Sequence, residues 1–286
     1  MRVLVTGATG QIGCFLLVRL QDIGMDVVAV SRNAYSSEHS EVWVVRDLQT
    51  DDPFMDQESF DYWIHAGFLS LVPRWLESAK KAGVKRVVTF SSTSVFTKQD
   101  SSSPYERTII RSLIEAEEEL SRQCEVLGID WTLLRPTMIY GAGRDKNVSF
   151  VQSMIRRFGL FPLVGGGKGK RMPVHADDLA QAAVAAMQSD AAVNRSYNLG
   201  GGETLTYREF VERIFTLENR NPRFINIPLV VARLLVHLVR LLPAFRHVTP
   251  AMFERMSIDL VFDYSDAARD LDYCPRPFTF ESNACV

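Results

Sequence analysis

The sequence predicts an α/β fold: a doubly wound, mainly parallel sheet flanked by helices, with a smaller C-terminal α/β lobe. Three observations predict it. Residues 1–32 read as strand, glycine-rich turn, helix and strand; short apolar strands then alternate with helices up to about residue 145; and from Lys146 the segments become smaller and mixed. We therefore expect a Rossmann-like dinucleotide-binding core over residues 1–145 and mostly a substrate lobe over 146–286, with some segments returning to the core.

The opening unit is the most specific feature of the chain. An apolar strand over 3–5 runs into a loop with glycines at 7, 10 and 13, a helix over 11–23 follows, and Gly24 precedes a strand over 27–30. The first glycine permits a sharp turn, the second lets backbone approach a pyrophosphate, and the third lets the helix pack on the sheet, with the phosphate at the helix N-terminus. The residues expected to bind the cofactor here are Gly7, Thr9, Gly10, Gln11 and Ile12.

Composition excludes several classes of function. The 286 residues carry a formal net charge of −2, which gives no electrostatic basis for binding nucleic acid. The four cysteines stand far apart, so we expect neither a metal site nor a disulfide framework, and cysteine usage of this kind fits the reducing cytoplasm. The apolar run after Arg2 stops at Thr6-Gly7, so we expect no signal peptide, and no run of about eighteen apolar residues could span a membrane.

The spacing of Thr6, Gly7, Gly10 and Gly13 resembles the short-chain dehydrogenase/reductase superfamily. Two later segments are similar to its NAD-dependent epimerase/dehydratase branch: 134–143, which reads Leu-Arg-Pro and then Tyr-Gly-x-Gly, and 171–180, which contains an Asp-Asp pair. The resemblance implies oxidoreductase or epimerase-type chemistry on a nucleotide-sugar or a related small molecule.

Further positions bear on the choice of cofactor. Ser31-Arg32 follows the second strand, where an NAD-preferring unit usually carries an acidic residue for the ribose hydroxyls. An arginine there suits a 2′-phosphate, so NADP(H) is favoured over NAD(H); the alternative is an ordinary exposed arginine. A third strand is expected over 38–45, and the resemblance implies that Asp47-Leu48 beyond it contacts the adenine. Ala66-Gly67, after the strand 62–65, leaves room for the cofactor ribose, and His65 is expected to be a packed strand-end histidine.

The expected catalytic segment follows the strand 86–90. Ser91 and Ser92 resemble the family's Ser-Ser-x-x-Val-Tyr segment, with Ser92 at the position of the catalytic hydroxyl and Ser91 beside the cofactor. A helix over 104–127, with Ser103, Pro104 and Glu106 at its start in a capping-box pattern, should carry the family's Tyr-x-x-x-Lys pair.

That pair is missing from the sequence. Tyr105 occupies the family's Ser-Pro-Tyr position, but Ile109 then stands where the lysine belongs. Counting back from Leu134-Arg135-Pro136 without gaps instead puts Ile109 at the tyrosine and Leu113 at the lysine. Since the two registers differ by one helical turn, Tyr105 remains the candidate proton donor beside Ser92.

Substrate contacts are expected from the second half of the chain. The resemblance implies that backbone at Pro136 and Thr137 lies against the nicotinamide and that Arg171 faces the diphosphate of a nucleotide-sugar, a solvated loop being the alternative. Tyr140 is a further candidate for substrate binding. Because Phe68 to Gly83 leaves room for only one short helix, over 74–82, we expect a monomer or weak dimer.

Two alternatives stay open. A helix over 228–242 carries Arg233, His237 and Arg240 on one stripe, so it could contact an anionic membrane surface, although such a helix more often lines the substrate lobe. The apolar Ile109 and Leu113 also favour a second function: a catalytically silent NAD(P)(H)-binding protein that acts as a redox-responsive or assembly partner.

Overall fold

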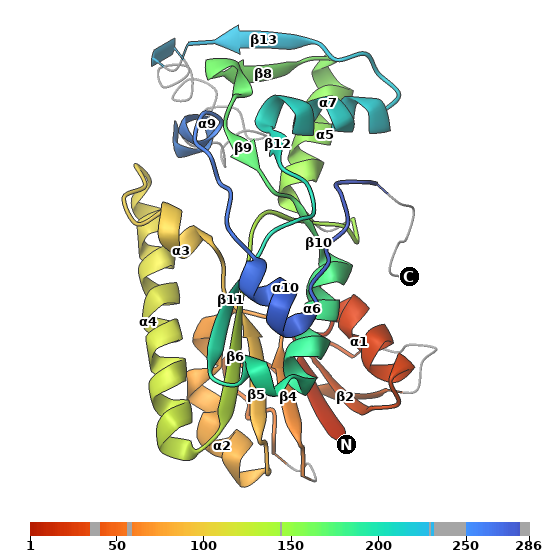
Figure 1. The fold of residues 1–286 in the computed structure, drawn as a ribbon, viewed down its shortest axis with the longest axis vertical. Coiled ribbons are helices and arrows are strands. Elements are labelled where there is room, and N and C mark those ends of the chain that lie inside the picture. The colour runs from red at the N-terminus through yellow and green to blue at the C-terminus, as the bar shows by residue number, and fades with distance from the viewer. Residues whose placement is uncertain (35–40, 56–58, 144, 229, 232–249, 281–286) are drawn as a thin grey trace.

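A seven-stranded parallel sheet forms the centre of the computed structural model, which describes residues 1–34, 41–55, 59–143, 145–228, 230–231 and 250–280 (Figure 1). The strand order is β11-β6-β5-β4-β1-β2-β3, and every neighbouring pair is parallel. The strands are β1 (Arg2–Thr6), β2 (Asp26–Ser31), β3 (Val42–Val45), β4 (Tyr62–His65), β5 (Arg86–Phe90), β6 (Asp130–Pro136) and β11 (Arg195–Leu199).

Helices cover both faces of this sheet. Val3 and Val5 of β1 face one cluster, which includes the apolar side chains of α1 (Gly13–Asp22), α6 (Ala176–Gln188) and α10 (Ser265–Leu271). Leu4 faces the other cluster, with α2 (Leu76–Lys81) and α4 (Pro104–Leu127). The central strands are buried on both sides, which explains why they read as continuous apolar runs rather than as alternating patterns.

A smaller lobe packs beyond the C-terminal ends of the strands (Figure 1). Three two-stranded ladders build it: β10-β7 and β13-β8 are parallel, and β12-β9 is antiparallel. Its core is aromatic, with Phe161, Phe210 and Phe278 among the buried members. The remaining elements are η1 (Leu69–Leu71), η2 (Pro73–Trp75), α3 (Ser94–Thr97), β7 (Ile139–Tyr140), α5 (Lys146–Phe158), β8 (Phe161–Val164), η3 (Gly165–Gly167), β9 (Lys170–Arg171), β10 (Val174–His175), η4 (Asp190–Ala192), β12 (Leu205–Thr206), α7 (Tyr207–Leu217), β13 (Phe224–Ile227) and α9 (Pro250–Arg255).

The doubly wound sheet with flanking helices is therefore confirmed. After the lobe strands β8 to β10 the chain returns to the sheet through α6 and β11, and it returns again through α10. The expected strand 38–45 is described only from residue 41, since 35–40 lie outside the described residues, as does most of the expected helix 228–242.

The predicted helix over 104–127 is found as α4, but its start differs from a complete capping box. Ser103 accepts the amide of Glu106, and Gly128 ends the helix in the left-handed conformation at φ 60°. The Glu106 carboxylate does not turn back to the Ser103 amide, because Arg255 of α9 binds it through both terminal nitrogens, at 2.8 and 2.9 Å. A tertiary ion pair between the core and the lobe has replaced a local contact.

Candidate functional site

The glycine loop between β1 and α1 is packed so tightly that side chains are excluded. Gly7 has φ +75°, and a Cβ on it would lie 2.6 Å from the carbonyl carbon of Ala66 and 2.8 Å from the amide nitrogen of Gly67. A Cβ on Gly13 would lie 2.3 Å from the Gly7 carbonyl oxygen. The segment Ala66-Gly67 is thus the wall against which the loop turns, and this contact accounts for small residues in both places.

The N-terminus of α1 faces this loop without a capping side chain. Ile12 is the N-cap, is buried, and makes no side-chain cap; the first turn of the helix carries no acidic residue. The positive end of the helix dipole is therefore left for an anion. Gln11 donates from Nε2 to the Gly141 carbonyl at 3.0 Å, which ties the loop to the segment after β7. Thr9 is exposed beside it.

The expected adenosine-binding residues lie where their strands end. Ser31 is buried and its hydroxyl accepts the Asn33 amide at 3.2 Å, while Arg32 is exposed. Asp47 accepts the Gln49 amide at 3.0 Å, and the buried Leu48 presents its carbonyl to the Trp75 indole at 2.9 Å. Ser31 ends β2, Arg32 follows it, and Asp47 and Leu48 follow β3, at the edge of the sheet to which β1 delivers the glycine loop.

His65 is a packed structural residue, as expected. Its Nε2 lies 3.0 Å from the Phe68 carbonyl, which can only accept, so Nε2 carries the proton. Nδ1 then accepts from the Thr6 hydroxyl at 2.7 Å, and Thr6 in turn accepts the Trp63 indole N–H at 2.8 Å. Burial lowers the pKa of His65 to about 4, so the ring stays neutral.

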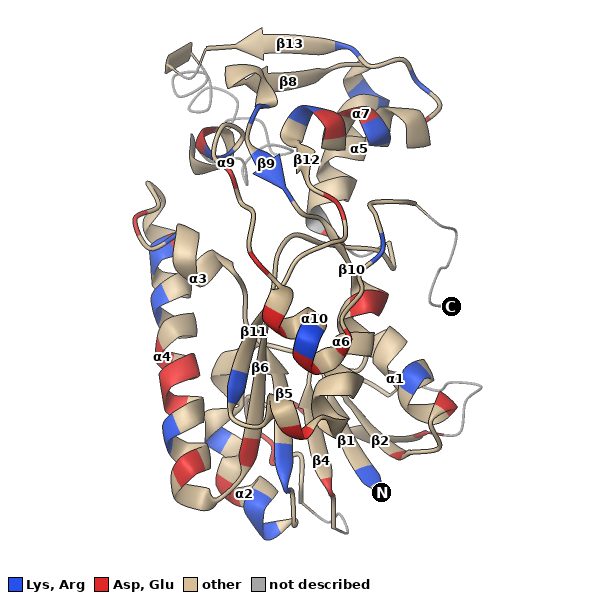
Figure 2. Cartoon of the chain, in the orientation of Figure 1, with Lys and Arg blue, Asp and Glu red and all other residues tan. Residues whose placement is uncertain are grey.

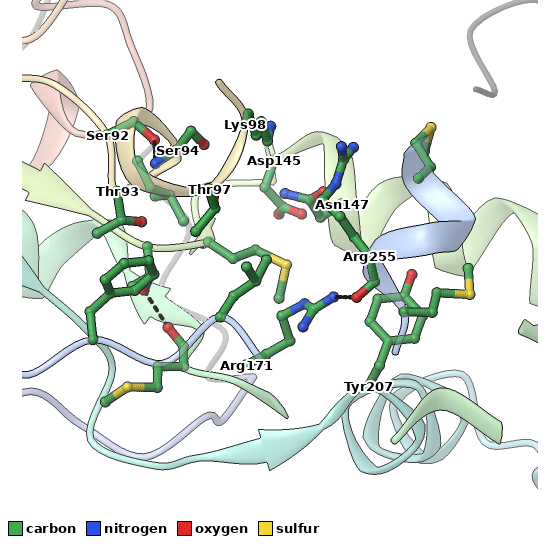
Figure 3. Close-up of a pocket in the computed structure, with 18 of the residues that line it drawn as sticks. Ser92, Thr93, Ser94, Thr97, Lys98, Asp145, Asn147, Arg171, Tyr207 and Arg255 are labelled. Atoms are coloured by element: carbon green, nitrogen blue, oxygen red, sulfur yellow. Dashed lines mark hydrogen bonds between the residues drawn. The ribbon is translucent and has the colours of Figure 1, made fainter. Parts of the chain in front are cut away.

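A cavity of about 480 Å³ lies between the core and the lobe (Figure 3). It begins at Gln11 of the glycine loop, runs along the segments after β5 and β6, and is closed by α5, β9, α7 and the α9 region. The residues that line it are Gln11, Ser92, Thr93, Ser94, Thr97, Lys98, Thr137, Met138, Ile139, Asp145, Asn147, Phe150, Arg171, Met172, Tyr207, Met252, Phe253, Arg255, Met256, Leu260 and Phe262.

The two candidate serines take different directions. Ser92 lines the cavity, and its hydroxyl accepts the Ser94 amide at 3.1 Å. Ser91 donates instead to the Glu117 carboxylate of α4, which also binds Arg135 through Nε at 3.0 Å. Ser91 therefore joins β5 to α4, and Ser92 is the one that reaches the cavity.

Thr137 also lines the cavity, one residue after Pro136. Its amide donates to the Leu199 carbonyl at 3.0 Å, and its hydroxyl donates to the Met172 carbonyl. The Pro136 carbonyl accepts both the amide and the hydroxyl of Thr93 at 3.1 Å. This backbone segment is thus held on the same wall as Ser92.

The structure does not bring Tyr105 or Tyr140 into the cavity. Tyr105 is 75% exposed at the start of α4, and Ile109 one turn later is 46% exposed, while Leu113 packs against the apolar cluster beneath α4. Tyr140 is 2% exposed, and its hydroxyl donates to the Pro277 carbonyl at 3.3 Å within the lobe core.

Arg171 is the buried cation of the lobe wall. It forms part of the basic strand β9 in Figure 2, is 5% exposed, and donates from Nη1 to the carbonyls of Lys170 and Ile258, each at 2.7 Å. Among the described residues, no carboxylate forms an ion pair with it; burial lowers its pKa to about 10, and its guanidinium lies 5.4 Å from the centre of the Tyr207 ring. It is therefore a fixed, desolvated cation rather than part of a solvated loop.

Three charged lining residues were not expected from the sequence: Lys98, Asp145 and Arg255. Asp145 accepts the Val148 amide at 2.8 Å as the N-cap of α5, a signal that its position before an apolar-periodic segment could have revealed. Lys98 and Arg255 carry no such local signal.

Within the part of the chain that the structure describes, no cluster of His, Cys, Asp and Glu could hold a metal ion. No described helix is long and apolar enough to cross a bilayer.

Two known proteins are similar to this chain in sequence. The chain is 29% identical over 156 residues to the NADH dehydrogenase 1 alpha subcomplex subunit 9 of Arabidopsis thaliana, covering 51% of this chain and 38% of that one. It is 26% identical over 235 residues to an uncharacterised Sinorhizobium fredii protein, y4nG, covering 78% and 57% respectively. The chain thus spans only about two fifths to three fifths of the length of these relatives.

Solved structures give the same fold. A UDP-glucose 4-epimerase of Thermotoga maritima, solved with UDP-glucose, matches with a TM-score of 0.70 at 18% identity, over 96% of this chain and 94% of that one. A short-chain dehydrogenase/reductase superfamily protein of Agrobacterium tumefaciens with bound NAD matches with a TM-score of 0.71 at 15% identity, over 98% and 93%. Residues 3–200 match the family model described as the NAD dependent epimerase/dehydratase family, and the chain belongs to that family.

Proposed function

We propose that this chain binds NADP(H) along the C-terminal edge of its sheet and acts on a nucleotide-sugar or related small molecule in the adjoining cavity. One observation carries the proposal: Gln11 belongs to the glycine loop and also lines the cavity that contains Ser92 and Arg171. A dinucleotide whose pyrophosphate lies on α1 would therefore extend its nicotinamide toward that cavity.

The preference for NADP(H) rests on Arg32. Its exposed guanidinium follows β2, at the edge where the ribose of a bound adenosine would lie. A 2′-phosphate there would gain a charge-assisted hydrogen bond. NADPH should bind more tightly than NADH by about 10-fold, the equivalent of about 1.4 kcal/mol.

The chemistry proposed for the cavity uses Ser92 and Arg171. The Ser92 hydroxyl would hold the reacting oxygen of the substrate. Arg171 would pair with the diphosphate because its guanidinium is buried and bound to no carboxylate of the described residues: Nη1 donates to the carbonyls of Lys170 and Ile258, and Nη2 donates to the Arg255 carbonyl. The bound cofactor supplies or accepts a hydride. Tyr105 could donate the proton only from a different rotamer or helix start, since it is 75% exposed outside the cavity; water and the substrate itself are the other sources.

A second function is favoured by that same exposure. With Tyr105 and Ile109 outside the cavity, the chain could hold the cofactor without turnover, as a redox-responsive or assembly partner. Its resemblance to an NADH dehydrogenase subunit supports this alternative.

Fluorescence titration with NADPH and NADH tests the cofactor proposal. Arg32→Ala should weaken NADPH binding about 10-fold and leave NADH unchanged. Arg122→Ala is the matched control, because Arg122 is an exposed arginine on α4 that pairs with Glu119. Equal losses for both coenzymes would reject the phosphate role of Arg32, and failure to bind either coenzyme would reject the proposed function.

Turnover separates the two functions. The protein is incubated with NADP⁺ and a panel of UDP-sugars that carry deuterium on their ring carbons, and exchange of deuterium into C4 of the cofactor is followed by mass spectrometry. Exchange that disappears in Ser92→Ala, but persists in Ser121→Ala on the exposed face of α4, supports the enzyme. Cofactor binding with no exchange across the panel supports the silent protein.

A further inference from the structure

The charges inside the cavity do not cancel. Of its described lining residues, Lys98, Arg171 and Arg255 are cationic and Asp145 is acidic. Asp145 is committed to the start of α5, where it accepts the Val148 amide at 2.8 Å, and burial raises its pKa. Among the described residues it forms no ion pair with Lys98, Arg171 or Arg255.

Arg255 is already neutralised. Both of its terminal nitrogens bind the Glu106 carboxylate, at 2.8 and 2.9 Å, and Glu106 also accepts the Ser101 hydroxyl at 2.5 Å. The Lys98 ammonium lies farther from this carboxylate, at 4.0 Å. Glu106 therefore faces two cations. Because Arg255 binds both of its carboxylate oxygens, Glu106 neutralises Lys98 only in part.

The surroundings of Lys98 at the cavity disfavour the charged form of its side chain. Burial is the main cause that lowers its pKa and Arg255 adds to it, while Glu106 acts in the opposite direction. Its side chain is 28% exposed, so solvent reaches the ammonium only in part. An anion entering the cavity would stabilise the charged lysine and would replace the missing counter-charge.

Lys98 and Arg171 lie on different walls. Figure 3 shows Lys98 on the core side with Ser94 and Thr97, and Arg171 on the lobe side near Tyr207. Lys98 ends the same short segment, after β5, that begins with Ser92. An anion at Lys98 would therefore lie close to the reacting part of a ligand, whereas the diphosphate would lie at Arg171.

We propose that Lys98 is a second anion subsite, which binds a carboxylate on the sugar of a nucleotide-sugar, so that the cavity selects nucleotide-uronic acids over neutral nucleotide-sugars. This inference rests on the proposed function and adds its substrate class. A carboxylate fits because the subsite is small: one ammonium, with the hydroxyl-bearing Ser94 and Thr97 lining the cavity beside it.

The test compares UDP-glucuronic acid with UDP-glucose, which differ by the carboxylate at one sugar carbon. Affinities are measured by titration calorimetry with NADPH saturating. The wild-type protein should bind UDP-glucuronic acid about 10-fold more tightly, as expected for one partly buried charge-assisted contact. Lys98→Met should remove this preference while changing the affinity for UDP-glucose less than about 2-fold, and Lys98→Arg should keep part of it.

Lys170→Met is the matched control, because Lys170 is an exposed lysine of β9 that is not among the residues lining the cavity. It should retain the preference. Equal affinities in the wild-type protein, or a preference that survives Lys98→Met, would overturn the role of Lys98 and leave the proposed function standing. If neither nucleotide binds while NADPH does, the nucleotide-sugar proposal fails and this inference fails with it.

Discussion

Three glycines around α1 allow backbone strain and steric crowding to be measured separately. Gly24 has φ +72°, and a Cβ added to it would meet nothing within 4 Å, so Gly24→Ala adds strain alone. Gly13 lacks a positive φ, but its Cβ would lie 2.3 and 2.5 Å from the carbonyl oxygens of Gly7 and Ala8, so Gly13→Ala adds crowding alone. Gly7→Ala combines both, with φ +75° and a contact of 2.6 Å to Ala66 backbone.

The expected losses differ accordingly. Gly24→Ala should lower the free energy of unfolding by about 1–2 kcal/mol, the cost of a left-handed alanine. Gly13→Ala should lower it by about 1–3 kcal/mol, because backbone carbonyls cannot move aside as a flexible side chain would, and a gain of up to about 1 kcal/mol in helix propensity offsets only part of this. Gly7→Ala should cost about 2–5 kcal/mol, the sum of the two effects.

Urea unfolding followed by far-ultraviolet circular dichroism measures the losses, and NADPH fluorescence reports on the loop. Gly24→Ala should keep cofactor affinity, while Gly7→Ala and Gly13→Ala should weaken it at temperatures where all three variants are folded. If Gly13→Ala proved as stable as the wild-type protein and bound NADPH normally, the close packing of the loop on α1 would be refuted.

Three further outcomes follow from buried groups. Since burial lowers the pKa of His65 to about 4, the unfolded chain binds a proton that the folded chain does not as the pH falls below 6.5; stability should decline by on the order of 3 kcal/mol between pH 6.5 and 4, and His65→Asn should flatten that decline in urea midpoints. Glu106→Gln should lower the melting temperature, at a cost of about 1–3 kcal/mol, because Arg255 and Lys98 would then repel each other unscreened; Glu119→Gln on the exposed face of α4 should change it little. Burial raises the pKa of Cys124 to about 12, so iodoacetamide at pH 8 should label the exposed Cys274 and spare Cys124 until the chain unfolds, and equal labelling in the native protein would contradict this burial.

The parts of the fold that follow from short-range chemistry were open to prediction. The βαβ unit was predictable because a positive φ favours glycine at positions 7 and 24, and the nearby Gly7 and Ala8 carbonyls leave no room for a side chain at Gly13. The helix from Pro104 to Leu127 was bounded by a capping serine and by Gly128. The buried His65 was predictable from its place in an apolar strand. Each of these signals acts between residues close in the chain, so the sequence displays it directly.

The cavity was less open to prediction, because its walls come from segments far apart in the chain. A serine pair after β5 gave no sign that Ser91 would bind Glu117 while Ser92 would reach the cavity. The role of Arg255 was hidden for the same reason, since its partner Glu106 lies 149 residues away.

By itself, the sequence determined that a parallel sheet would deliver a glycine turn to the N-terminus of a helix, because backbone sterics and hydrophobic periodicity act locally. Only the tertiary structure decided three further features. Tyr105 lies in solvent, Arg171 is buried without a carboxylate partner of the described residues, and Lys98 shares the Glu106 carboxylate with Arg255. The reason is electrostatic. The burial, partners and pKa of a charged side chain depend on every group packed around it, and those neighbours come together only when the lobe packs against the core.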